Sequence, residues 1–151
     1  MLEVSSPQEL VAHVGKPIGT SDWLTVDQTM IDAFAAATGD RQWIHVDVMR
    51  ARRDMPGGRT IAHGFLTLSL LPRLADSVLT ISGRTHTLNY GSNRVRFTAP
   101  VPSGARIRLH MKLLSAEPVA KGLRFTYENT VEIEGEAKPA LVAETILVAY
   151  T

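Results

Sequence analysis

The chain has 151 residues, of which 44% are hydrophobic and 21% are charged, and it contains no cysteine. This length fits one domain with a hydrophobic core of its own, and the lack of cysteine excludes disulfides, thiolate nucleophiles and cysteine-based metal sites. The net charge of +1 argues against a nucleic-acid binder, and no apolar run approaches the roughly 20 residues that span a bilayer, so we predict no nucleic-acid or membrane partner.

The first half of the chain reads mainly as helices and loops. Residues 6–9 (Ser-Pro-Gln-Glu) form a capping box with proline at the first helical position, and the N-terminus lacks the pattern of a signal peptide, which favours a cytoplasmic location. Residues 25–28 (Thr-Val-Asp-Gln) form a second capping box. Apolar residues then recur at helical spacing until Gly39, which suits a left-handed C-terminal cap. We therefore expect Asp40 just past a helix end and His45 in the next loop or turn.

A third helix is predicted from about His63 to Val78. Leucine, phenylalanine and valine cover most of its circumference, which is typical of a buried helix. Pro72 lies inside this pattern and predicts a kink or an early break.

The second half reads as strands. Apolar and polar residues alternate over residues 94–97, 106–112 and 123–134, as in half-buried antiparallel strands. Residues 141–150 are apolar at both parities, which predicts a central or doubly covered strand. We expect a single α+β domain over residues 1–151, in which a curved antiparallel sheet wraps the buried helix.

Two polar pairs stand out between these apolar segments. Asp40 and His45 form a plausible acid/base pair, because imidazole titrates near neutrality and a carboxylate can orient a water molecule. The competing interpretation is that Asp40 caps a helix end or turn and that His45 is a satisfied polar residue. The second pair is His63-Gly64 at the head of the buried helix. The Gly64 N–H could bind a ligand oxygen, or the glycine could serve only a tight entry into the helix.

In their order, these residues resemble the hydratase motif of the MaoC-like dehydratases, which include the (R)-specific enoyl-CoA hydratases. The matching segments are Phe-Ala-x-x-Thr-Gly-Asp-x-x-x-Ile-His-x-Asp over residues 34–47 and Ile-Ala-His-Gly-Phe over residues 61–65. Residues 89–108 resemble the subgroup related to nodulation protein N. The family often has Asn-Pro between its aspartate and histidine, where this chain has Gln42-Trp43.

The resemblance implies a hot-dog fold, a homodimer and hydration of a trans-2-enoyl thioester. It assigns the acid/base roles to Asp40 and His45, and it places Gly64, Ser69 and His63 in substrate binding. It implies no metal and no cofactor beyond the coenzyme A or acyl-carrier part of the thioester substrate. A hot-dog thioesterase and a non-catalytic acyl-thioester binding module are the alternatives.

The stretch from residue 50 to 60 is rich in arginine and reads as a loop. Its guanidinium groups could meet the phosphates of coenzyme A. The alternative is an ordinary solvated loop.

Overall fold

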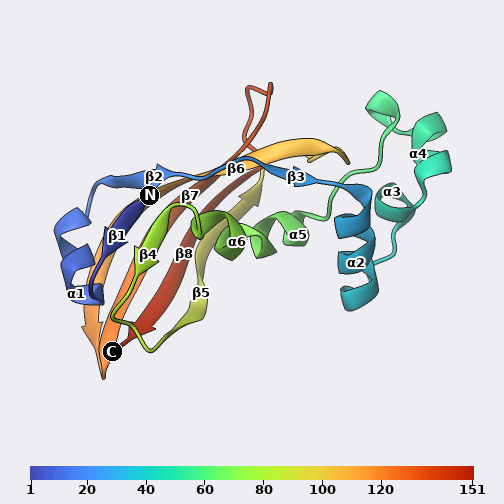
Figure 1. Cartoon of the computed structure of the whole chain (residues 1–151). Coiled ribbons are helices and arrows are strands. Elements are labelled where there is room, and N and C mark those ends of the chain that lie inside the picture. The colour runs from blue at the N-terminus through green and yellow to red at the C-terminus, as the bar shows by residue number, and fades with distance from the viewer.

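The computed structural model describes residues 1–151, and its main feature is a curved sheet that wraps a broken helix (Figure 1). The sheet has six strands in the order β2-β6-β7-β8-β5, with β3 also paired to β6, and every pairing in it is antiparallel. Its strands are β2 (Pro17–Thr20), β3 (Leu24–Val26), β5 (His86–Phe97), β6 (Ala105–Val119), β7 (Gly122–Ile133) and β8 (Leu141–Tyr150).

The helix inside the curve of the sheet consists of α5 (Gly64–Ser69) and α6 (Leu71–Ala75). Pro72 stands in the first turn of α6, so the predicted break is present. Leu66, Leu70 and Leu74 are buried against the sheet, whereas Phe65 is 67% exposed. The helix is therefore buried along one side only, and not around its whole circumference.

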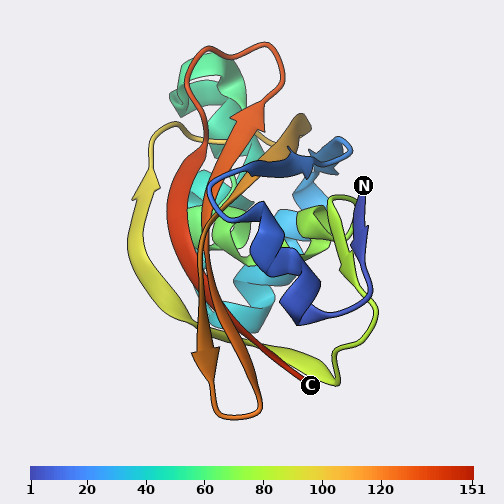
Figure 2. The same cartoon turned by 90° about the vertical axis from the view of Figure 1, so that its left-hand side faces the viewer.

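The remaining helices lie at the two ends of the sheet (Figures 1 and 2). At one end are α2 (Gln28–Thr38), α3 (Trp43–Val46), α4 (Val48–Asp54) and the 3-10 turn η2 (Pro56–Gly58). At the other end, α1 (Pro7–Leu10) and η1 (Val11–His13) lie near a small parallel sheet of β1 (Leu2–Val4) and β4 (Leu79–Ile81).

The helix ends largely follow the sequence signals. Ser6 caps α1 by accepting a hydrogen bond from the Glu9 N–H. The cap of α2 is Asp27 and not Thr25, because the Asp27 carboxylate accepts from the Met30 N–H. Gly39 ends α2 with a φ of 79°, as predicted, and Asp40 is therefore the first residue after the helix cap.

The strands are longer than their predicted cores, and the short strands were not predicted. Residues 94–97 are the end of the twelve-residue strand β5, which pairs along one side only, with β8. The strand β8 lies between β7 and β5, in agreement with its apolar sequence. The alternating burial of β7 gives the core its largest fully buried side chains, Tyr127 and Phe125.

Candidate active site

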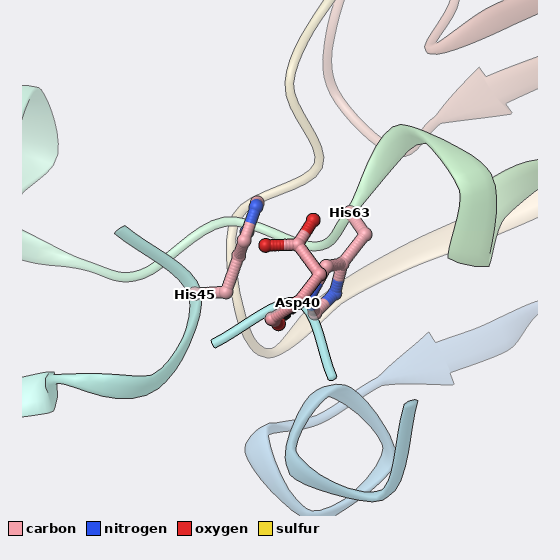
Figure 3. Close-up of side chains that lie close together, drawn as sticks. All are labelled: Asp40, His45 and His63. Carbon is pink, nitrogen blue, oxygen red and sulfur yellow. Dashed lines mark hydrogen bonds between the residues drawn. The ribbon is translucent and has the colours of Figure 1, made fainter. Parts of the chain in front are cut away.

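Asp40, His45 and His63 come together where the helical end of the molecule meets the start of α5 (Figure 3). Asp40 follows α2, His45 lies on α3, and His63 directly precedes α5. One side-chain ligand atom from each of the three lies within 4.8 Å of the others. His45 is 7% exposed and His63 is 2% exposed, whereas Asp40 is an exposed residue.

The His45 ring is held by a backbone carbonyl. Its Nδ1 lies 2.6 Å from the Ile61 oxygen. A carbonyl oxygen only accepts, so Nδ1 carries the proton and donates it. In the neutral ring, Nε2 is then a free lone pair that can take a proton from a reactant.

The His63 ring is held in the same way and lies against His45. Its Nε2 donates to the Asp40 carbonyl oxygen at 2.9 Å, and the two imidazoles stack with centroids 3.8 Å apart. Its Nδ1 is buried and has no hydrogen-bond partner. His63 therefore fixes the backbone of Asp40 and the plane of His45, which makes it a positioning residue in this geometry.

Gln28 is a functional candidate that the sequence analysis missed. Its side-chain amide donates to the His45 carbonyl oxygen at 2.8 Å and accepts from the Thr60 hydroxyl at 2.5 Å. It thereby connects the first turn of α2 to α3 and to the segment that leads into α5. The only sequence signal was a glutamine beside the helix cap, which is too common to indicate this role.

Gly64 has a packing reason to be glycine. A Cβ at this position would lie 2.9 Å from the Phe97 ring on β5, closer than real Cβ contacts come. Gly64 is also the first residue of α5, where the N–H groups have no partner within the helix. The two interpretations of this glycine, close packing and a free donor, are thus compatible.

Ser69 lies apart from this cluster. It is exposed at the end of α5, five residues after Gly64, which corresponds to about 7.5 Å along a helix. There it lines a cavity of about 600 Å³ between α5–α6 and the sheet, whose walls include none of Asp40, His45, His63 and Gly64.

The first part of the arginine-rich segment is helical and not a loop, and Arg59 follows in extended backbone. The helix α4 carries Arg50, Arg52 and Arg53, and its N-cap is the Asp47 carboxylate, which accepts from the Arg50 N–H. Arg50 packs over the Trp43 ring at 4.0 Å and is paired with Asp54. These arginines face solvent beside the candidate site.

Comparison with known proteins defines the class of this chain. The MaoC like domain matches residues 9–134, and the chain therefore belongs to the MaoC-like family. The 3-hydroxyacyl-thioester dehydratase Z of Mycobacterium tuberculosis is 49% identical over 148 residues, with 97% of each chain covered. Nodulation protein N of Rhizobium leguminosarum bv. viciae is 49% identical over 142 residues, covering 93% of this chain and 88% of that protein.

Solved structures agree on the fold. The (R)-hydratase from A. caviae involved in PHA biosynthesis aligns with a TM-score of 0.70 at 20% identity, covering 87% of this chain and 95% of that one. The R-hydratase PhaJ1 from Pseudomonas aeruginosa aligns with a TM-score of 0.70 at 24% identity, covering 91% and 81%. The predicted family, the hot-dog α+β fold and the prediction of a hydratase/dehydratase enzyme are confirmed.

Two further features bear on the chemistry. The side chains of Asp40, His45 and His63 are close enough to hold a divalent cation, although each imidazole already uses one nitrogen on a backbone carbonyl. None of the helices has the length and hydropathy that a bilayer crossing requires.

Proposed function

We propose that this protein hydrates a trans-2-enoyl thioester to an (R)-3-hydroxyacyl thioester, and catalyses the reverse dehydration, with Asp40 and His45 as its acid/base pair. The observation that carries the proposal is the free Nε2 of a buried, backbone-anchored His45 beside the Asp40 carboxylate. The name of the mycobacterial relative, a 3-hydroxyacyl-thioester dehydratase, supports the same substrate class.

The geometry suggests how the atoms move. His45 takes a proton from water as the water oxygen attacks Cβ of the enoyl group. Asp40 holds that water and supplies or relays the proton that Cα receives. The Gly64 N–H, at the positive end of α5, stabilises the negative charge that develops on the thioester oxygen. One water is consumed, and its hydroxyl and proton end on Cβ and Cα.

This reaction needs no metal and no redox cofactor, because the substrate already carries the activating thioester carbonyl. We therefore propose a cofactor-free enzyme whose substrate brings its own coenzyme A or acyl-carrier group. The absence of cysteine agrees with a reducing compartment, so a cytoplasmic location is part of the proposal.

The test is hydration of crotonyl-CoA by Asp40→Asn and His45→Gln. Each change is expected to lower kcat by roughly a hundred- to ten-thousand-fold while the protein stays folded, the range that positioned proton transfer supplies. Asp22→Asn and His13→Gln make the same chemical changes outside the site and should leave kcat intact. Near-normal turnover in either folded site variant would remove the pair from the mechanism.

The assay also separates the rival reaction. Free thiol is released only by hydrolysis, so the enoyl absorbance and thiol release are followed together. Thiol release without loss of the double bond would indicate a thioesterase. Binding of the thioester with neither reaction would indicate a binding module.

We further propose a homodimer paired through the free edge of β5. That strand pairs with β8 alone, and it leaves Leu88 52% and Tyr90 65% exposed. An unpaired apolar edge of this kind is a template for another strand. Light scattering should give twice the 16.5 kDa mass of one chain, and Leu88→Lys should shift the population toward monomer. A wild-type protein that remains at 16.5 kDa at micromolar concentration would refute the dimer.

A further inference from the structure

The cavity between α5–α6 and the sheet is lined by apolar and polar side chains. The helix side presents Leu68, Leu71 and Ala75 to it. The sheet side presents apolar residues such as Met111 and Phe125 and, beside them, neutral polar residues that we call the polar stripe: Thr87, Ser92, Tyr127, Asn129 and Thr145. The proposed hydration chemistry uses none of these residues.

The register of the strands produces the stripe. Tyr127 of β7 pairs with Thr145 of β8, which pairs in turn with Ser92 of β5. These residues share the inner face of the sheet because directly paired residues point to the same side. Asn129 lies two residues from Tyr127 on that face, and its side-chain amide donates to the Thr145 hydroxyl at 2.8 Å.

Polar groups in such a place are costly unless they find partners. Tyr127 is 1% exposed and Asn129 is 3% exposed. The Thr87 hydroxyl is buried and has no hydrogen-bond partner. Burial raises the pKa of the Tyr127 hydroxyl, and the positive charge of Arg84 opposes that shift. Tyr127 and Thr87 both line the cavity, and for the Thr87 hydroxyl the chain supplies no partner.

We propose that this cavity binds an acyl chain that carries a neutral oxygen function, a hydroxyl or a carbonyl, several carbons away from the thioester. The proposal rests on the proposed function, which places the thioester at Gly64. Tyr127 and Thr87 would be the residues that recognise the oxygen, and a plain alkyl chain would leave both hydroxyls unpaired.

The chemistry of the stripe narrows the ligand class. Its buried members carry no charge, so they can donate to and accept from a hydroxyl or a carbonyl. The charged residues of the lining, Asp76 and Arg84, are exposed and opposite in sign. Distance narrows it further. From Gly64 a helix rises about 6 Å to Leu68 and about 10 Å to Leu71, which both line the cavity, so a four-carbon acyl group held at Gly64 would reach its near end at most.

The experiment measures binding without turnover. Octanoyl-CoA and its 5-, 6-, 7- and 8-hydroxy derivatives are saturated between C2 and C3, so the proposed reaction cannot consume them. Their dissociation constants are determined by calorimetry on the wild type, Tyr127→Phe and Thr87→Val. Tyr150→Phe is the matched control, because it also removes a tyrosine hydroxyl, but from a residue that does not line the cavity.

We expect at least one hydroxy derivative to bind the wild type about tenfold more tightly than octanoyl-CoA. That preference should fall by about tenfold in Tyr127→Phe or Thr87→Val, and it should persist in Tyr150→Phe. Equal or tighter binding of octanoyl-CoA by the wild type, or a preference that survives both cavity changes, would overturn the proposal. Crotonyl-CoA hydration does not depend on the stripe. A protein that fails to hydrate crotonyl-CoA would refute the proposed reaction, whereas the binding preference is tested by the dissociation constants alone.

Discussion

The two regions along α5–α6 handle buried polar groups in opposite ways. At the head of α5, His45 and His63 each donate one ring N–H to a backbone carbonyl, which fixes the orientation of both rings, and among their buried ring nitrogens only the His63 Nδ1 is left without a partner. Beside α6, the polar stripe relies on side chains, and the Thr87 hydroxyl has no partner. Backbone anchors of this kind would organise the proposed acid/base pair before any substrate arrives. A wall of unpaired hydroxyls becomes satisfied only when a ligand supplies the partner.

We therefore expect the two regions to have different roles. The anchored end suits a reaction that needs fixed proton donors and acceptors, and the cavity suits selection among acyl chains. Changes at the anchored end should therefore lower both turnover and stability. Changes in the stripe should affect selectivity, and some should even stabilise the fold.

A large combined effect on stability and turnover is expected where the two regions meet, in Gly64→Ala. A helical alanine would by itself gain about 1 kcal/mol over glycine. Its Cβ, however, meets the Phe97 ring at 2.9 Å, and overpacking of this kind costs about 1–3 kcal/mol. We expect a net loss of up to about 2 kcal/mol in urea unfolding, together with reduced crotonyl-CoA hydration.

A double-mutant cycle isolates the cause of that loss. In Gly64→Ala/Phe97→Ala the clash is gone, so the two changes should be non-additive by at least about 1 kcal/mol. Additive losses would show that Phe97 is not the reason for the glycine.

The next effect concerns Gln28, whose side chain connects His45 to Thr60. Gln28→Met keeps the length of the side chain but leaves the Thr60 hydroxyl, which is 2% exposed, without its acceptor. We expect a loss of about 1–3 kcal/mol in stability and a fall of about tenfold in kcat, because the His45 backbone is no longer held.

A second variant separates positioning from folding. Thr60→Val added to Gln28→Met removes both partners, which should recover much of the stability while kcat stays low. Recovery of kcat together with stability would mean that Gln28 serves the fold alone.

These variants also mark what the sequence could and could not predict. Asp40, His45, His63 and Gly64 lie within 25 consecutive residues, so a local motif was enough to bring them together. Gln28 belongs to the same corner but joins it through tertiary contacts that leave no pattern in the sequence. Residues 50–54 were wrongly predicted as part of a loop, because the proline and the two glycines of that segment come only after α4 has ended.

The polar stripe could not be predicted for a different reason. Thr87, Tyr127 and Thr145 are far apart in the chain and meet only through strand register. Most of β5 also lacks apolar alternation, since an edge strand exposes both of its faces. In the sequence, Tyr127 occupies one more apolar position of the alternation in β7, and only the structure reveals that it lines a cavity.

Tyr127→Phe tests the stripe through stability, with an effect of the opposite sign. Removing a buried hydroxyl that lacks a partner should raise the free energy of unfolding by up to about 1 kcal/mol at neutral pH. The raised pKa of Tyr127 adds a pH dependence. The stability linked to this raised pKa is fully present below the ordinary tyrosine pKa of 10.0 and is lost as the pH rises above that value. The reason is that Tyr127 ionises at lower pH in the unfolded chain than in the folded protein.

Tyr127→Phe should therefore lose less stability than the wild type when the pH is raised from about 9 to about 11, a range that spans the ordinary tyrosine pKa of about 10. Urea titrations across that range, with Tyr150→Phe as the control, measure the difference. A destabilised Tyr127→Phe would mean that the hydroxyl already has a partner in the folded protein.

The smallest effect is expected on the outer face of the same strands, where polar groups are paired but exposed. Glu132 accepts from Arg108 at 2.7 Å and from His110 at 2.6 Å, and these hydrogen bonds, led by that of Arg108, lower the pKa of its carboxyl. A lowered pKa means that the contribution is present above the ordinary value of 4.5 and is lost as the pH falls through the folded value. Glu132→Gln should cost about 0.5 kcal/mol at pH 7, as is usual for surface ion pairs, and the gap should close in acid. Urea unfolding in acid and at pH 7 measures this difference between Glu132→Gln and the wild type, and Glu136→Gln, which changes an unpaired glutamate, is the control. A difference that persists in acid would show that Glu132 acts through packing and not through its charge.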